Sequence, residues 1–429
     1  MRRTPLVGLF AGLALALTAC GSGDGGSTTA ADGELTGRGP ITLVSGKDRS
    51  GNMQKMVAGW NAAHPKEPVR IIELPDEPND QRQQLIQNAT TKSDAYTVLS
   101  LDVVWTAEFA ANRWLTELPK DKLDTSKLLP ATVKTGEYRG RLFAMPVNSD
   151  AGLLYYRTDL LKKAGIDEPP TTWAQMWEAC DKVRALPEGE DVDCYLTEVG
   201  KTEGLTVSAA EAVNSAGGVF FDASGQPAVN TPQARAGMDF LVNAIKDGRM
   251  PRAALTLDGE GGRRHFQSGK LLFHRQWPYQ YELANADDGS SKVAGKFAVA
   301  PIPGPNGPGA ANLGGHNYAI SAFAKNKATA LDFIKYMTDP AQQKADSLAT
   351  SKAPTVAALY DDPELIEKYP YLPALKEAIQ KAQSRPVVVR YGDVTAAIQS
   401  AFYDALGGKT PPDRALTDLQ SKLAGLATP

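Results

Sequence analysis

Between residues 41 and 102, short apolar runs alternate with segments of helical periodicity, and this alternation restricts the fold more than any other feature. The apolar runs are residues 41–44, 69–74 and 98–101. Helix-type spacing of i, i+3, i+4 and i+7 is found after the first run at Met53, Met56, Val57 and Trp60. A polar helix is expected over residues 80–91. This order predicts a parallel sheet with crossover helices. Asp102 follows the third run at its carboxyl end. Open parallel sheets bind their ligands beyond the carboxyl ends of the strands.

A second α/β region begins near Asn148. Thr171 or Thr172 can cap a helix that starts at Trp173. A further helix face consists of Ala234, Met238, Leu241 and Ile245. Residues 296–303 are typical of a strand that leads back toward the first region, and the pattern after Glu364 is mostly helical.

Composition excludes several classes of function. The 429 residues include 46 Lys and Arg against 49 Asp and Glu, a net charge of −3, so the basic surface of a nucleic-acid-binding protein is absent. Only 4 His and 3 Cys are present, which leaves little material for a metal site. We expect no metal and no cofactor.

The amino terminus has the pattern of an export signal. Arg2 and Arg3 precede an apolar run from Leu6 to Leu17, which is too short for an ordinary membrane span. The sequence Leu-Thr-Ala-Cys that ends at Cys20 resembles a bacterial lipobox, which implies a signal over residues 1–19 and a lipidated Cys20. Residues 20–39 would then hold the lipid anchor and a flexible tether. A plain secretory signal with an incidental cysteine is the alternative.

The other two cysteines lie fourteen positions apart in a turn-rich stretch. Because exported proteins fold in oxidising surroundings, Cys180 and Cys194 are predicted to form a disulfide. Two separately buried thiols are the alternative.

Several segments, by their order and spacing along the chain, resemble the extracellular solute-binding proteins of carbohydrate ABC importers. The resemblance rests on residues 101–118, 141–160, 170–173, 266–270, 314–320, 330–343 and Pro354. It implies a two-lobed α/β fold, each lobe a mostly parallel sheet flanked by helices, with the ligand cleft between the lobes. The expected lobes are residues 40–147 with 300–352, and residues 148–299 with 353–429.

A sugar site needs planar polar groups for hydroxyls and aromatic plates for apolar C–H faces. Such groups stand at the ends of expected elements, and the candidates are Asp80, Asp102, Trp105, Asn148, Asp150, Glu260, Trp277, Tyr279, Gly314, Gly315, Arg390 and Tyr391. Several have structural alternatives: Trp105 and Trp277 as core, Asp102 as a helix cap, Asp150 as a hinge residue, and Glu260 as a solvated residue in a glycine-flanked turn.

Relatives that bind trehalose or other α-glucosides look similar around Asp102, Asn148, Glu260, Trp277, Gly315 and Arg390. The resemblance therefore implies trehalose first, maltose-type α-glucosides second and other oligosaccharides third. It also implies a monomer, held by its lipid on the outer face of the cell membrane, that serves a permease with a separate ATPase.

Two other classes of function compete with this interpretation. A secreted glycosidase would use Asp102 and Glu260 as paired carboxylates, although the sequence contains no H-E-x-x-H, G-x-S-x-G or S-x-x-K motif. A binding protein for a non-sugar solute, such as a polyamine, is the other alternative.

Overall fold

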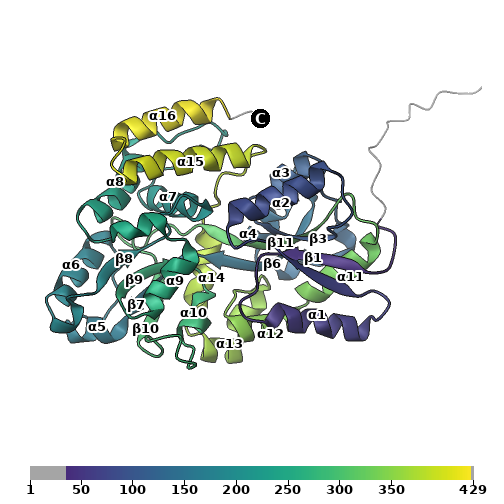
Figure 1. The fold of residues 1–429 in the computed structure, drawn as a ribbon, viewed down its shortest axis with the longest axis horizontal. Coiled ribbons are helices and arrows are strands. Elements are labelled where there is room, and N and C mark those ends of the chain that lie inside the picture. Colours follow the sequence, from purple (N-terminus) through teal and green to yellow (C-terminus); the bar gives the residue numbers. More distant parts are fainter. Residues whose placement is uncertain (1–34, 427–429) are drawn as a thin grey trace, which may run out of the picture. The chain divides into compact units, whose positions relative to one another are not determined.

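The computed structural model describes residues 35–426, and their strands form two main sheets with separate sets of helices (Figure 1). The first sheet has the strand order β2-β1-β3-β11-β6. Its strands are β1 (Ile41–Ser45), β2 (Val69–Glu73), β3 (Val98–Asp102), β6 (Ala144–Ala151) and β11 (Leu313–Ile320). β1 pairs in parallel with both β2 and β3, which confirms the parallel arrangement predicted for residues 41–102.

The second sheet has the order β10-β7-β9-β8. Its strands are β7 (Leu153–Arg157), β8 (Asp193–Leu196), β9 (Leu271–Gln276) and β10 (Phe297–Pro301). Each sheet is mostly parallel, as expected, with a single strand that runs against the others. In the first sheet this strand is β11, which is antiparallel to β3 and β6, and in the second it is β7, which is antiparallel to β9 and β10. β11 and β7 are the strands by which the chain enters each sheet after crossing from the other one.

Most of the helices lie where the periodicity of the sequence predicts them. Those joined to strands of the first sheet are α1 (Asn52–Ala63), α2 (Pro78–Thr90), α3 (Thr106–Ala111), α4 (Pro130–Thr135), α11 (Lys327–Thr338) and α12 (Pro340–Thr350). Those of the second region are α5 (Thr158–Lys163), α6 (Trp173–Arg184), α7 (Glu203–Ser215), α8 (Pro232–Lys246), α9 (Gly259–Gln267), α10 (Gln280–Ala284), α15 (Tyr391–Leu406) and α16 (Pro412–Ala424). A small hairpin of β4 (Glu137–Tyr138) and β5 (Arg141–Leu142) completes the strands of the described residues.

Local signals explain where several helices begin. Thr172 caps α6 by accepting a hydrogen bond from the backbone N–H of Gln175, whose side chain returns to the Thr172 backbone. The predicted core faces of α1 and α8 are buried, including Trp60 and Met238. Glu260 was expected in a glycine-flanked loop, but it belongs to a helix. It lies in the first turn of α9, which Asp258 caps.

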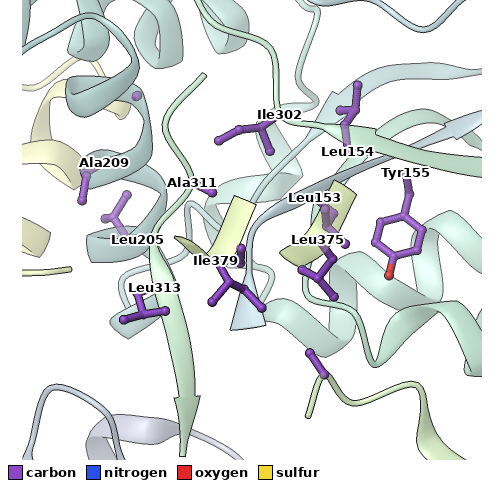
Figure 2. Close-up of a cluster of buried hydrophobic side chains, with 14 of the residues drawn as sticks. Leu153, Leu154, Tyr155, Leu205, Ala209, Ile302, Ala311, Leu313, Leu375 and Ile379 are labelled. Atoms are coloured by element: carbon purple, nitrogen blue, oxygen red, sulfur yellow. The ribbon is translucent and has the colours of Figure 1, made fainter. Parts of the chain in front are cut away.

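A third crossing of the chain passes through α13 (Pro363–Lys368) and α14 (Leu372–Lys381). α14 packs against the crossing strands through buried apolar side chains. Figure 2 shows part of this cluster, with Leu153, Leu154, Leu313, Leu375 and Ile379 among its labelled members. This buried junction holds the ends of the crossing strands in place.

Cys180 of α6 and Cys194 of β8 are joined by a disulfide in the structure. The predicted signal over residues 1–19 and Cys20 lie outside the described residues, as does most of the tether. Within residues 35–426, no helix has both the length and the apolar character that crossing a bilayer requires. The proposed lobe boundaries stay a prediction.

Candidate functional site

A cavity of about 780 Å³ is lined by residues from both regions of the fold. A volume of this size suits a small organic ligand. The first region contributes the loop of residues 45–50 after β1, the end of β3, and parts of β6 and β11. The second region contributes Glu260 of α9, Tyr279, and residues 282–287 around α10. Residues at the end of α12 close a further side.

Six of the predicted ligand-binding residues line this cavity: Asp102, Trp105, Asn148, Asp150, Glu260 and Tyr279. Trp105 is only 2% exposed and packs in an apolar cluster with Phe109, so it offers little surface to a ligand. Tyr279 is half-buried, and its hydroxyl donates to Glu260 Oε1 over 2.8 Å. Their ligand-binding roles stay predictions.

Trp277 and the glycine pair lie outside the cavity lining, in contrast to the expectation. The Arg275 guanidinium lies 4.0 Å from the centre of the Trp277 ring. A Cβ atom on Gly314 would stand 2.7 Å from an atom of that ring, so the glycine makes room for the tryptophan. Gly315 has φ +114°, and a Cβ there would meet the Asn148 carbonyl oxygen at 2.3 Å. The two glycines therefore leave the space that the Trp277 ring and the backbone of Asn148 occupy.

Arg390, Tyr391 and Asp80 also lie outside the lining. Arg390 is half exposed and pairs with Asp393, one turn further along α15. Tyr391 is fully buried, and its hydroxyl donates to Glu203. Asp80 is exposed in the first turn of α2. Arg390 and Tyr391 lie at the start of α15, where their side chains pair with Asp393 and Glu203 and not with groups of the lining.

Arg385, five residues before Arg390, pairs with the lining residue Asp102. Its Nη2 donates to Asp102 Oδ1 over 2.7 Å, and its Nη1 donates to Glu203 Oε1 over 2.6 Å. Asp102 Oδ1 also accepts the backbone N–H of Val104 over 3.1 Å. The guanidinium is 2% exposed, so this pairing takes place out of water. Asp102 is therefore a wall residue that closes a turn, and the helix-cap alternative is wrong because α3 begins only at Thr106 and has no side-chain cap.

Glu260 is held by cations from two elements. Arg263 donates to its Oε2 over 2.8 Å, and Arg49, from the loop after β1, lies 3.1 Å from the same oxygen. Burial opposes ionisation of Glu260, but the hydrogen bonds from Arg263 and Tyr279 and the nearby positive charges outweigh burial and lower its pKa. Glu260 is therefore ionised and fully partnered at neutral pH.

Asp150 has the most perturbed carboxyl group of the lining. Burial raises its pKa to about 7, against the opposing charges of Lys352 and Arg275, and the charge of Asp102 adds to the increase. Its one side-chain hydrogen bond comes from Asn148 Nδ2, over 3.0 Å. Asp150 consequently keeps hydrogen-bonding capacity that the protein does not use.

The sequence prediction missed His316, Lys352 and the loop of residues 45–50, all of which line the cavity. The loop could have been found, because it directly follows the carboxyl end of β1, where ligands of parallel sheets bind. His316 and Lys352 reach the cavity only through long-range packing, which leaves no local signal. In residues 35–426, no group of three or more His, Cys, Asp or Glu side chains is placed to hold a metal ion.

Known proteins of similar sequence and structure identify the family. The family model described as "bacterial extracellular solute-binding protein" matches residues 45–344. A probable ABC transporter-binding protein of Deinococcus radiodurans is 34% identical over 365 residues, covering 83% of this chain and 86% of that protein. A mannitol-binding protein of Pseudomonas aeruginosa is 26% identical over 90% of this chain and 92% of its own length.

Among solved structures, maltose-bound MalE3 of T. maritima superimposes with a TM-score of 0.85 and 33% identity, covering 90% of this chain and 99% of that one. The two-lobed fold predicted from the resemblance is confirmed by this match. Proteins of this family bind solutes and are not enzymes, so the glycosidase alternative is wrong. The chain belongs to the bacterial extracellular solute-binding proteins of ABC transporters, with their two-lobed α/β fold.

Proposed function

We propose that this protein captures a neutral sugar or polyol in its cavity and hands it, chemically unchanged, to an ABC permease. The observation that carries the proposal is the pairing of the cavity's acidic side chains with cations. Four such acids and their partners are Asp76 with Arg49, Asp102 with Arg385, Glu260 with Arg49 and Arg263, and Glu282 with Lys368. A polyamine would need several unpaired acids. Among the described lining residues only Asp48, Asp150 and Asp287 lack an ion pair, so this pairing favours an uncharged ligand over a polycation.

The groups that remain for a ligand suit hydroxyls. Asn148, Asp150 and His316 bring an amide, a carboxyl and an imidazole to the cavity lining. Lys352 adds an ammonium whose nearest carboxylate oxygen, on Asp346, is 4.0 Å away. Sugar hydroxyls both donate and accept hydrogen bonds, so they can satisfy every one of these groups.

Little aromatic surface faces the cavity, which favours a compact ligand. Trp105 and Tyr318 line it but are only 2% and 3% exposed, and Trp277 is not part of the lining. Tyr279 is half-buried and its hydroxyl is engaged by Glu260. A long α-glucan that stacks its sugar rings on aromatic plates would find few partners here. We therefore keep trehalose as the first candidate and maltose-type α-glucosides as the second. Because one relative is a mannitol-binding protein, linear polyols belong in the same test.

A ligand panel tests the proposal. The mature protein should be stabilised against heat by trehalose, maltose or mannitol, and not by spermidine, since ligands that bind only the folded state raise the melting temperature. The ligand recovered after incubation should be unchanged by chromatography. Stabilisation by spermidine alone would contradict the assignment of a neutral ligand.

The anchor and the partners are part of the same proposal. A diacylated Cys20 would hold the protein, as a monomer, on the outer face of the membrane beside its permease, and a separate ATPase would supply the energy. Radiolabelled palmitate should label the wild-type protein in cells and leave Cys20→Ser unlabelled. Equal labelling of both proteins would contradict lipidation at Cys20.

A further inference from the structure

His316 occupies the middle of a row of three polar side chains across the first sheet. β11 lies between β3 and β6, and His316 is directly opposite Asp102 on one side and Asn148 on the other. Residues directly opposite one another on paired strands point to the same face of a sheet. All three line the cavity.

Local backbone geometry presents the imidazole to the cavity. His316 is the one exposed residue of β11, whose other seven positions are buried. The pairing register between β11 and β6 shifts directly after His316, which leaves Val147 as an extra residue on β6. Such irregularities re-aim side chains next to binding sites. Gly315, with its positive φ, lets the strand pass close to Asn148 just before this point.

Of the three side chains in this row, the His316 imidazole has no hydrogen-bond partner among the described residues. Asp102 is engaged by Arg385, and the Asn148 amide donates to Asp150. No residue in the described range 35–426 makes a hydrogen bond or an ion pair with the His316 ring. A polar group that faces a cavity without a protein partner is available to a ligand.

Its protonation state fits a hydroxyl partner. The protein around the cavity-facing ring desolvates it and so lowers the pKa of His316, the charges of Lys352 and Arg385 lower it further, and Asp102 opposes the shift. The ring is therefore neutral at neutral pH, with one nitrogen that donates and one that accepts. A sugar hydroxyl offers the same pair of functions, so both partners can be satisfied.

Asp150 stands close enough to act on the same ligand. It is opposite Gly314, two positions from His316 along β11, which makes it a diagonal neighbour of the histidine. Diagonal neighbours in a sheet have Cα atoms about 7–8 Å apart, a distance that two hydroxyls of one sugar ring or polyol chain can span.

We propose that His316 binds the ligand directly, through a hydrogen bond between its neutral imidazole and a hydroxyl, while Asp150 binds a second hydroxyl of the same molecule. The inference rests on the proposed function and makes it more specific. It defines the substrate class as an uncharged molecule with at least two hydroxyls that reach both side chains. A ligand whose hydroxyl at one of these points is replaced by hydrogen should bind poorly.

Isothermal titration calorimetry of three His316 variants tests the inference, with the panel ligand that binds the wild-type protein best. His316→Phe keeps a ring without polar atoms and should weaken binding by about 10- to 100-fold, the loss that follows when hydrogen-bonding groups of a bound ligand are left unpaired. His316→Gln keeps a donor and an acceptor and should stay within about fivefold of wild type. His316→Ala should resemble His316→Phe.

Two controls separate local from general effects. Asp247→Asn changes an exposed residue at the end of α8, outside the lining, and should alter affinity less than twofold. Melting temperatures of all variants should match the wild type, because His316 makes no contact that the fold requires. Ligand addition should also shift the ring nitrogen resonances of His316 in the nuclear magnetic resonance spectrum of the unmutated protein.

The outcomes distinguish this inference from the proposed function. If the wild-type protein binds a sugar or polyol and His316→Phe binds it equally well, His316 is not a ligand contact and only this inference fails. If the wild-type protein binds no panel sugar or polyol, the proposed function fails and the inference with it. Unchanged ring resonances on saturation with ligand would also overturn the role of His316.

Discussion

Arg49 and Glu260 form an ion pair between the two regions that line the cavity, with Arg49 Nε 3.1 Å from Glu260 Oε2. Arg49 belongs to the loop after β1, and its Nη2 also lies 3.0 Å from Asp76 on the same side. Glu260 lies in the first turn of α9, in the second region. The pair can form only while the two regions are close together. We therefore expect it to favour a closed form, in which the regions approach each other across the cavity, over an open form.

Replacing Arg49 should shift the protein toward open forms without unfolding it. The pair is partly exposed, with 31% of the Arg49 side chain and 17% of the Glu260 side chain accessible, so its contribution is about 1 kcal/mol or less. Arg49→Gln should weaken ligand binding by at most about fivefold and increase the radius of gyration of the ligand-free protein in small-angle scattering. Arg70→Gln, at an exposed position on β2, is the matched control and should change neither. Tighter binding by Arg49→Gln would contradict this role.

Arg385 should be essential for stability, in contrast to its neighbour Arg390. Arg385→Met leaves the carboxylates of Asp102 and Glu203 without their buried cation, which typically costs about 3–5 kcal/mol. Arg390→Met removes an exposed pair from the same segment and should cost no more than about 0.5 kcal/mol. Urea unfolding measures both. Equal losses would show that the buried network around Arg385 is not what stabilises this crossing.

Asp150 should make stability depend on pH in a defined direction. Its pKa is raised from 3.8 to about 7 in the folded protein, so the folded state binds the proton more tightly than the unfolded state. This contribution is fully present below the unfolded pKa and is lost as the pH rises toward 7. Asp150→Asn should therefore have little effect on the free energy of unfolding at pH 4 and should stabilise the protein increasingly up to pH 8. A stabilisation that is the same at both pH values would contradict the assignment.

Trp277 should matter more for stability than for ligand affinity. Trp277→Ala removes the ring that lies against the Arg275 guanidinium and fills the space beside Gly314, and should cost about 2 kcal/mol or more of unfolding free energy. Affinity for the ligand should change less than threefold, because the ring is not part of the cavity lining. Trp277→Phe, which keeps an aromatic ring, should lose less stability. A large loss of affinity at unchanged stability would instead identify Trp277 as a sugar platform.

Local periodicity was sufficient to predict the parallel strands β1, β2 and β3 of the first sheet and several helices. The faces that bury Trp60 in α1 and Met238 in α8, and the Thr172 cap of α6, depend on residues within one or two turns. The strand-end rule also pointed to Asp102, which lines the cavity. These features are determined by short-range sequence, so the chain alone reveals them.

The failures share a long-range cause. Whether Arg385 or Arg390 pairs with the lining residue Asp102 depends on the path of the chain between α14 and α15, and no pattern in residues 386–390 distinguishes the two. The position of His316 depends on how β11 pairs with β3 and β6, strands that are more than 150 residues away in the sequence.

Isothermal titration calorimetry of the wild-type protein with trehalose, maltose, mannitol and spermidine tests the central claim most directly. The account predicts saturable 1:1 binding of at least one uncharged polyhydroxylated ligand and no binding of spermidine, because the lining acids Asp102, Glu260 and Glu282 are paired with arginine and lysine side chains. Saturable binding of spermidine with no heat from any of the three uncharged ligands would contradict it.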